Sequence, residues 1–359
     1  MSEKAYQELY KRYRPTSWEG LIGQERVAKS LQAAIKSNKL PSAYLFAGPR
    51  GCGKTSSAFL MAKAINCLEP KPSGPCNECD VCVNIDNGVQ LGVNYLSASN
   101  ISSGGADKIR SIVQEAKLTQ PVKLQVWIID EVHSLSRQAF DSLLIPLEET
   151  SMSALFIFCT TEIDRVPQTI LSRVQQRRFS LVDATNMKKL LNHIVSVEKI
   201  DTSENVIDDA IRRGRGSVRD TLTAFESILD TGEYTLSYSG QLLENLSKHD
   251  LTGALATISQ AVKGGNEPDS LAEQLFEDLR NLLLSASNVD ESLIGIIPVS
   301  DKNAVTKGFI SKQGIMYVMD EIGNAITEMS MGPSSRINLE IGIVKSIAAL
   351  KKLKKAVAK

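Results

Sequence analysis

The chain has 359 residues, of which 42% are hydrophobic and 23% are charged, which is enough apolar material for the cores of two or three globular domains. Its 41 basic and 41 acidic side chains cancel, which excludes a general polyanion binder and confines any contact with nucleic acid to a local patch. The sequence has no signal-peptide core and no run of eighteen apolar residues, so we expect a cytoplasmic protein without a membrane segment.

A phosphate-binding loop is the first feature with a chemical meaning. The apolar segment AYLFAG, residues 43–48, predicts a buried strand, and the apolar spacing of residues 56–66 predicts a helix. Between them GPRGCGKT, residues 48–55, fits the pattern G-x-x-x-x-G-K-[ST] at every fixed position. Strand, loop and helix in this order predict a nucleotide site formed by Gly48, Pro49, Arg50, Gly51, Cys52, Gly53, Lys54 and Thr55.

The residue types of this loop suit the phosphates of ATP. Its glycines let the backbone turn N–H groups toward the phosphates, and the helix N-terminus adds the positive end of its dipole. We expect Lys54 to neutralise phosphate charge and the hydroxyl of Thr55 to bind Mg²⁺.

Four cysteines follow in the polar segment CLEPKPSGPCNECDVC, residues 67–82. Cys67, Cys76, Cys79 and Cys82 form two overlapping C-x-x-C pairs with one upstream thiol, which supplies the four thiolates of a tetrahedral zinc site. A redox pair, two disulfides, an iron–sulfur cluster and chance clustering are the alternatives, although reducing conditions disfavour disulfides. We interpret the segment as a zinc knuckle with a structural role.

Strands and helices continue to alternate beyond the cysteines. Buried strands are predicted within residues 93–98, 125–133 and 154–161, and amphipathic helices at 105–117 and 136–149. Alternation of this kind predicts an α/β fold with a doubly wound parallel sheet flanked by helices.

An acidic pair closes the strand in QVWIIDEVH, residues 125–133. Asp130 and Glu131 stand at its C-terminal end, where parallel sheets place their ligands. We expect Asp130 to hold Mg²⁺ through water and Glu131 to polarise the attacking water as a general base. An acidic pair alone also fits a solvated turn, but the phosphate-binding loop upstream favours the ATPase interpretation.

Residues 240–359 differ in pattern from the part that precedes them. Segments at 250–262, 269–286, 314–329 and 337–350 have helical periodicity, and no β-hairpin signature accompanies them. The pattern predicts an all-α domain.

Seven segments together carry a family resemblance. They are YKRYRPTSWEGLIGQE, AYLFAGPRGCGKTSSA, the four-cysteine loop, IIDEVHSLS, LLIPLEET, TTEIDRVPQTILSR and GSVRDTL, in this order within residues 5–235. The set resembles the AAA+ clamp-loader ATPases, the gamma/tau family of bacterial DNA polymerase III subunits. The resemblance implies an AAA+ P-loop ATPase core with the knuckle at residues 1–182, a helical lid at 183–238 and an all-α collar for oligomerisation at 239–359.

The resemblance also implies roles for residues outside the phosphate-binding loop. Arg173 in LSRV matches the arginine finger that reaches a neighbouring subunit's ATP, although Val174 replaces the cysteine of the family's motif. Thr161, with Thr160 beside it, matches the first sensor of the nucleotide, and Arg219 matches the second. The segments RYRP and LIGQ match the stretch that wraps adenine, and their candidate contacts are Arg14, Pro15 and Ile22.

The function implied by the resemblance is that of the ATPase motor of a clamp loader, from a bacterium or a phage and in the short gamma-like form. Copies of the chain would form a ring with delta-like and delta-prime-like subunits. ATP binding would open a sliding clamp and place it on primer-template DNA, and hydrolysis would release it. ATP, Mg²⁺ and Zn²⁺ are the implied cofactors, and the nucleoid-associated replisome in the cytoplasm is the implied location.

Two other functions fit part of the pattern. One is an AAA+ DNA motor such as a branch-migration helicase, and the other is a clamp-loader scaffold subunit that does not hydrolyse ATP. The absence of a winged-helix signature after residue 240 weighs against the first, and the undamaged phosphate-binding loop weighs against the second.

Overall fold

The computed structural model describes residues 7–88, 92–100, 105–118, 122–149, 154–231, 237–289, 294–299, 302–329 and 334–357. The chain divides into two compact units. The N-terminal unit comprises Met1–Leu190 and Gly214–Thr223, and the C-terminal unit comprises Leu191–Arg213 and Ala224–Lys359.

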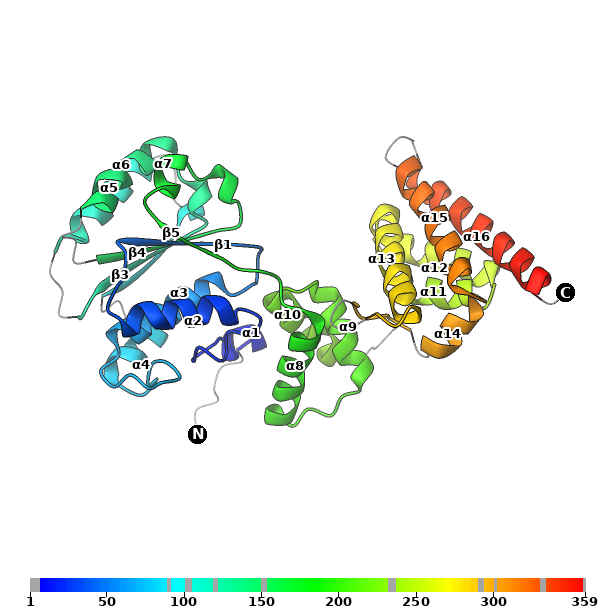
Figure 1. Cartoon of the computed structure of the whole chain (residues 1–359), viewed down its shortest axis with the longest axis horizontal. Coiled ribbons are helices and arrows are strands. Elements are labelled where there is room, and N and C mark those ends of the chain that lie inside the picture. The colour runs from blue at the N-terminus through cyan, green and yellow to red at the C-terminus, as the bar shows by residue number, and fades with distance from the viewer. Residues whose placement is uncertain are drawn as a thin grey trace. The chain divides into compact units, whose positions relative to one another are not determined.

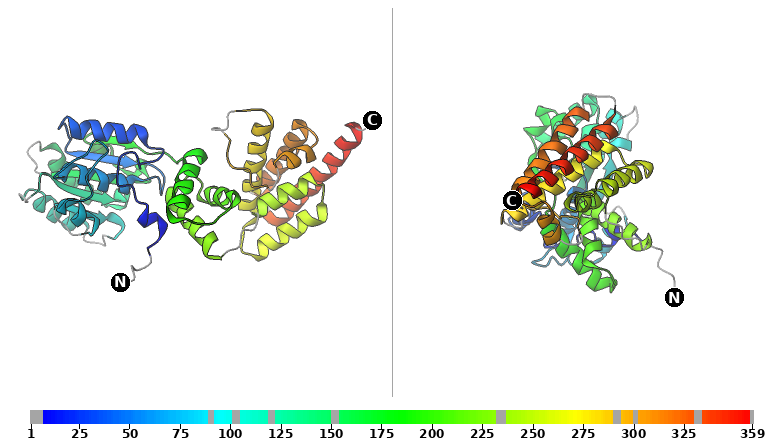
Figure 2. Two further views of the ribbon diagram at one scale, coloured as in Figure 1. Left: turned by 90° about the horizontal axis from the view of Figure 1, so that it is seen from below. Right: turned by 90° about the vertical axis from the view of Figure 1, so that its right-hand side faces the viewer.

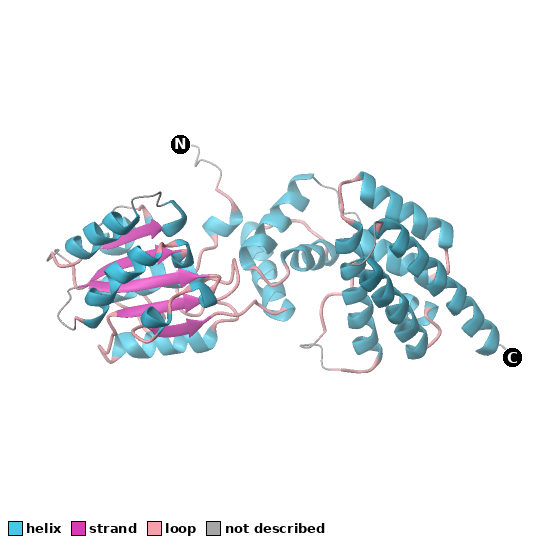
Figure 3. Cartoon of the chain, turned by 90° about the horizontal axis from the view of Figure 1, so that it is seen from above, coloured by secondary structure: helices cyan, strands magenta, loops and turns pink. Residues whose placement is uncertain are grey.

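A five-stranded parallel sheet lies at the heart of the N-terminal unit (Figures 1 and 3). Its strand order is β2-β3-β4-β1-β5, with every neighbouring pair parallel. The strands are β1 (Ala43–Ala47), β2 (Val93–Ser97), β3 (Gln125–Asp130), β4 (Ala154–Thr160) and β5 (Gln175–Arg178). The α/β fold with a parallel sheet is therefore confirmed, and the chain segments that follow β1, β3 and β4 leave the sheet at the same edge.

Helices cover both faces of this sheet. Successive residues of a strand point to opposite faces, so Phe46 packs in one hydrophobic core and its neighbour Leu45 packs in the other. The first core is shared with α2 (Glu25–Lys36) and α3 (Lys54–Asn66), and the second with α5 (Gly105–Glu115) and α6 (Arg137–Glu148). Figure 1 shows these two pairs of helices on opposite sides of the strands.

Shorter elements complete the N-terminal unit. They are the helices α1 (Leu9–Arg12), α4 (Asp80–Asp86) and α7 (Gln168–Leu171) and the 3-10 helices η1 (Ala98–Asn100), η2 (Val132–Ser134) and η3 (Ile163–Arg165). The helices α8 (Ala184–Glu198), α9 (Glu204–Gly214) and α10 (Val218–Thr231) follow the sheet. The division between the two units runs through α8 and α10, and α9 belongs to the C-terminal unit except for its last residue. The division into core, lid and collar at residues 182 and 238 stays a prediction.

Helices build the described part of the C-terminal unit (Figure 2). After α10 they are α11 (Tyr238–Ser247), α12 (Leu251–Lys263), α13 (Pro268–Ala286), α14 (Lys302–Gly308), α15 (Lys312–Met329) and α16 (Ser335–Val357). One hydrophobic core contains side chains from all six of them. The four helices expected from periodicity form as α12, α13, α15 and α16. Among the described helices, none has the length and apolar character needed to cross a bilayer.

Candidate nucleotide site and cysteine cluster

The phosphate-binding loop joins β1 to α3, and two of its glycines have backbone conformations that favour glycine. Gly51 has φ = 71°, and Gly53, the N-cap of α3, has φ = 98°. A Cβ atom on Gly51 would also lie 1.9 Å from Ser217 Oγ. The loop therefore packs directly against the start of α10, where the N–H of Val218 donates to Gly51 O at 3.1 Å.

Lys54 begins α3 and turns its ammonium group back into the loop. Its Nζ donates hydrogen bonds to the carbonyl oxygens of Gly48 at 2.8 Å and Pro49 at 2.7 Å, and the residue is only 6% exposed. Both partners are neutral, so they do not cancel the positive charge. An anionic phosphate oxygen is a stronger partner for an ammonium group than a carbonyl, so the loop can exchange one for the other.

Thr55 and Asp130 link the start of α3 to the end of β3. Thr55 Oγ1 donates to Asp130 Oδ2 at 2.7 Å, and the backbone N–H of Glu131 donates to Asp130 Oδ1 at 2.9 Å. The Tyr95 hydroxyl lies 3.4 Å from Asp130 Oδ2, and burial together with this carboxylate raises the pKa of Tyr95 to about 12. Tyr95 therefore stays a neutral donor at physiological pH. A hydroxyl and a carboxylate in contact are the hard oxygen ligands that Mg²⁺ prefers, so the two residues fit this ion.

Glu131 follows β3 in the left-handed backbone region, with φ = 51°. A residue other than glycine is uncommon there, and such conformations cluster at functional sites. Thr161 Oγ1 donates to Glu131 Oε2 at 3.3 Å. The hydroxyl of Thr160 lies 3.0 Å from His133 Nδ1 instead, and Thr160 is fully buried. Of the two threonines named as the first sensor, Thr161 is the one that contacts the acidic residue.

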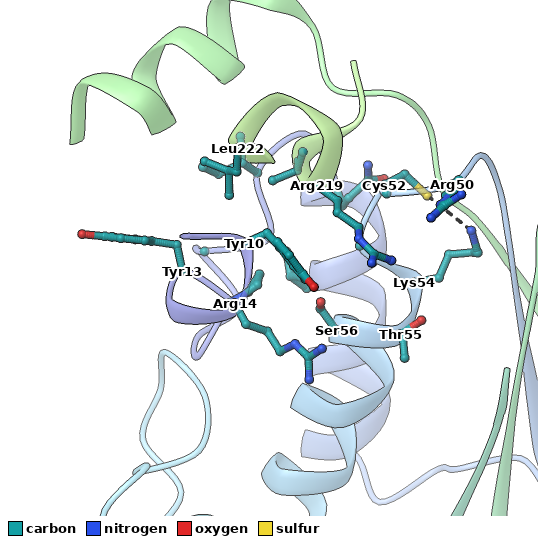
Figure 4. A pocket seen from close by; sticks show the side chains of 18 of the residues that line it. Tyr10, Tyr13, Arg14, Arg50, Cys52, Lys54, Thr55, Ser56, Arg219 and Leu222 are labelled. Atoms are coloured by element: carbon teal, nitrogen blue, oxygen red, sulfur yellow. Dashed lines mark hydrogen bonds between the residues drawn. The ribbon is translucent and has the colours of Figure 1, made fainter. Parts of the chain in front are cut away.

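A pocket in the N-terminal unit brings most of the predicted residues together (Figure 4). Those that line it are Arg14, Pro15, Ile22, Arg50, Gly51, Cys52, Gly53, Lys54, Thr55, Asp130, Glu131 and Arg219. Aromatic rings support two of its arginines: the Arg14 guanidinium lies 5.6 Å from the Phe59 ring centroid, and that of Arg219 lies 4.8 Å from the centroid of Tyr10. In Figure 4 the Arg219 side chain extends toward the phosphate-binding loop, and the Arg14 side chain extends toward α3.

Arg173 lies outside this pocket. It follows α7, and its guanidinium contacts the Glu148 carboxylate, with Nε donating to Oε1 at 2.8 Å. Its Nη1 also donates to the carbonyl oxygen of Thr169 at 2.8 Å, and about one third of the side chain is exposed. The pocket does not include Arg173, and its assignment as an arginine finger stays a prediction.

The four cysteines of residues 67–82 form a compact cluster whose sulfur atoms all lie within 4.8 Å of one another. Cys76 Sγ and Cys82 Sγ are 3.9 Å apart, close to the spacing of about 3.8 Å that a tetrahedral ion with metal–sulfur bonds of about 2.3 Å requires. All four residues are free thiols. The donor set and its spacing therefore fit a metal ion, and the alternative of two disulfides is not formed by these four residues.

Backbone N–H groups stabilise the cluster's sulfur atoms. The N–H of Cys76 donates to Cys67 Sγ at 3.2 Å, and those of Glu78 and Cys79 donate to Cys76 Sγ at 3.5 Å and 3.3 Å. The bonds from Glu78 and Cys79 lower the pKa of Cys76 to about 6, whereas burial raises the pKa values of Cys67 and Cys82. A lowered pKa favours the thiolate, which is the form that binds metal.

The cysteine segment is tied to the N-terminal residues that line the pocket. The N–H of Trp18 donates to Ser73 O at 3.0 Å, and Asn77 Nδ2 donates to Thr16 O at 3.1 Å. Thr16 and Trp18 lie between Pro15 and Ile22 in the chain, which both line the pocket. The cysteine segment is thus hydrogen-bonded to the stretch of chain between two residues that line the pocket.

Two polar residues near the acidic pair were not predicted. His133 lies in η2, and its Nε2 is 3.2 Å from Glu162 Oε1. Glu162 follows β4, so the two residues meet only because β3 and β4 are neighbours in the sheet. The histidine of DEVH was visible in the sequence, but no local pattern showed its partner.

Comparisons with known proteins find similarity to proteins named as DNA polymerase III subunits. Residues 23–183 match a family described as DNA polymerase III, delta subunit. The chain is 33% identical to DNA polymerase III subunit tau of Bacillus subtilis over 362 residues, which cover 95% of this chain and 63% of that protein. It is 28% identical to DNA polymerase III subunit gamma of Buchnera aphidicola over 365 residues, which cover 96% of this chain and 99% of that protein.

The chain spans less than two thirds of the length of the Bacillus subtilis relative. Among solved structures it is similar to the Thermotoga maritima RuvB Holliday junction branch migration motor, with a TM-score of 0.45 and 18% sequence identity. That similarity covers 73% of this chain and 88% of the other.

Proposed function

Because the chain belongs to the gamma/tau family of DNA polymerase III subunits, we propose that it is an ATPase subunit of a clamp loader. ATP binding would open a sliding clamp and place it on primer-template DNA, and hydrolysis would release the loader. The contact of Thr55 with Asp130 carries this proposal, because it joins the phosphate-binding loop to the acidic end of β3. With Lys54 and Glu131 beside it, the pocket has the groups needed for hydrolysis as well as binding.

The loop and α3 would bind the phosphates. Backbone N–H groups around Gly51 and Gly53 and the N-terminus of α3 offer partial positive charge, and Lys54 offers a full one. Lys54 would give up its two carbonyl partners for phosphate oxygens. The loop itself would change little, because its glycine conformations are already in place.

Thr55 and Asp130 are the residues that would hold Mg²⁺. When bound, this ion supplies neutralising charge for the phosphate oxygens. Glu131 would accept a hydrogen bond from the attacking water and draw its proton, and Thr161 would hold the carboxylate through Oε2.

The adenine base would lie against Pro15 and Ile22, with Arg14 at the edge of the same wall. Arg219 would act as the second sensor, because its guanidinium extends from the start of α10 toward the loop. The Tyr10 ring beneath Arg219 would keep that cation in place.

Arg173 would complete the site of a neighbouring copy. Its guanidinium is held by Glu148 within its own chain, so a γ-phosphate of the neighbour would have to replace that carboxylate. An arginine that reaches a phosphoryl group from another chain stabilises the charge of the transition state. Hydrolysis would then require assembly.

The cysteine cluster would hold one zinc ion in a structural role. Four sulfur ligands leave no open position for a substrate, which separates a structural zinc site from a catalytic one. Cys67, Cys76, Cys79 and Cys82 would be its ligands.

The expected partners are other copies of the chain, delta-like and delta-prime-like subunits, a sliding clamp and primer-template DNA. The collar of residues 239–359 would join the subunits in a ring, and the location would be the replisome at the nucleoid in the cytoplasm. No membrane partner is expected.

ATP hydrolysis by the reconstituted complex, with and without primer-template DNA, tests the proposal. We expect DNA and clamp together to stimulate hydrolysis, and we expect Lys54→Ala to abolish ATP binding. A strand-separation assay on branched DNA separates this function from that of a helicase. ATPase activity unaffected by primer-template DNA, or unwinding of the branched substrate, would contradict the proposal.

A further inference from the structure

The side chain of His133 lies between two carboxylates at the end of the sheet. Its Nδ1 is 3.3 Å from Glu131 Oε2, and its Nε2 is 3.2 Å from Glu162 Oε1. The ring is only 11% exposed, whereas Glu131 and Glu162 are 35% and 44% exposed. The imidazole therefore lies buried between the two acidic side chains, with Thr160 Oγ1 as a further neighbour of its Nδ1 at 3.0 Å.

We propose that His133 is a positioning residue that holds the Glu131 carboxylate for ATP hydrolysis, and that Glu162 fixes the histidine ring. The inference rests on the proposed function, since it assumes that Glu131 is the base. It assigns to His133 no contact with the nucleotide, the water or the metal ion.

Glu162 is itself held in place, which allows it to act as an anchor. Arg165 Nε lies 2.9 Å from Glu162 Oε2, so the two carboxylate oxygens of Glu162 face different partners. The backbone N–H of Glu162 donates to Thr160 Oγ1 at 3.0 Å, and the same hydroxyl lies 3.0 Å from His133 Nδ1. Ring and anchor therefore share the fully buried Thr160 at the end of β4.

Glu131 needs such support because its own backbone does not orient it. Its left-handed conformation turns the chain sharply after β3, and its side chain has several rotatable bonds. The contacts from His133 and Thr161 both fall on Oε2, so they orient the carboxylate without using Oε1. A base displaced by about 1 Å can lose about a hundredfold in rate, so loss of one support is expected to matter.

Three substitutions of one residue test the role. Asparagine places an amide nitrogen near the position of Nδ1, and glutamine places one near the position of Nε2. We expect His133→Ala to lower kcat for ATP by about 10- to 100-fold while KM changes by less than about threefold. His133→Asn is expected to restore most of kcat because it still reaches Glu131, and His133→Gln is expected to restore little.

Controls separate this inference from the proposed function. His193→Ala, at an exposed position of α8, is expected to leave both kcat and KM unchanged. The Glu131→Gln variant gives the rate of ATP hydrolysis without the proposed general base. If this variant hydrolyses ATP at the normal rate, the proposed function is wrong. If Glu131→Gln is inactive and His133→Ala keeps normal kcat, the inference about His133 is wrong. Equal losses in the Ala and Asn variants would also overturn it, because they would indicate a merely structural histidine.

Discussion

Replacing Gly51 with alanine tests how closely the phosphate-binding loop packs against the start of α10. The added methyl group would meet Ser217 Oγ at 1.9 Å and Ser217 Cβ at 3.0 Å. Ser217 also caps α10, because its Oγ accepts the N–H of Asp220 at 3.2 Å. The substitution therefore strains the loop and displaces a capping side chain at once.

The cost can be worked out from these two contributions. Alanine at φ = 71° costs about 1 kcal/mol relative to glycine, and loss of the Ser217 cap costs about 1 kcal/mol more. We expect Gly51→Ala to lower the free energy of unfolding by about 2 kcal/mol. In a Ser217→Gly background the methyl group has space and the cap is already gone, so the same substitution should cost only about 1 kcal/mol.

Tryptophan fluorescence during urea unfolding reports the unfolding of the N-terminal unit, which contains the loop. The sequence contains two tryptophans, Trp18 and Trp127, and both are buried in the N-terminal unit. Four chains complete a double-mutant cycle: wild type, Gly51→Ala, Ser217→Gly and the double variant. Gly53→Ala is the matched control, because a Cβ there meets nothing within 4 Å and its cost should be the same in both backgrounds.

Two results would refute the reasoning. One is a Gly51→Ala variant within about 0.5 kcal/mol of wild type, which would mean that the loop does not need glycine at this position. The other is an equal cost of Gly51→Ala in both backgrounds, which would mean that the loop and Ser217 are not in contact.

Three further outcomes are expected. Cys82→Ser should lower the zinc content of the purified protein, which we expect to be about one ion per chain in the wild type, and should lower its melting temperature. An unchanged zinc content by elemental analysis would exclude the cysteine cluster as the zinc site. Burial raises the pKa of Asp278 to about 7, against the opposing effects of the Ser239 hydrogen bond and Arg212. The folded state therefore keeps a proton that the unfolded chain releases above about pH 4, so stability should fall as pH rises from about 4 to 7. Asp278→Asn should remove that fall in urea titrations followed by circular dichroism, and an identical pH profile would contradict the shift. Arg173→Ala should leave ATP binding and complex assembly intact while abolishing hydrolysis in the assembled complex, and normal turnover would rule out its action on a neighbour.

Local patterns accounted for the sheet's buried strands and for the loop that binds phosphate. An apolar run followed by a glycine-rich loop is typical of a buried strand that leads through a tight loop into a helix. The positions of β1 and of the start of α3 could therefore be predicted. Strand β5, with sequence QQRR, was not predicted, because it carries the polar residues of an exposed edge and lacks the apolar signal of the other strands. Its pairing with β1 comes from tertiary packing, which a local pattern does not contain.

The candidate site also combines residues that local motifs predict with contacts that depend on the tertiary fold. Lys54, Thr55, Asp130 and Glu131 follow from two short motifs, and the pocket brings them together. The bridge from His133 to Glu162 joins segments separated by β4, so it depends on strand order. A sequence motif specifies which groups are present, and the sheet decides which of them meet.

The hydrogen bonds between the cysteine segment and residues 16–18 have a thermodynamic consequence. Trp18 N–H donates to Ser73 O, so the proposed adenine contacts and the proposed zinc ligands belong to segments that are hydrogen-bonded to each other. Two ligands that stabilise the same ordered segment each favour binding of the other, and the coupling is reciprocal. Zinc would then tighten ATP by the same factor by which ATP tightens zinc, although neither ligand touches the other.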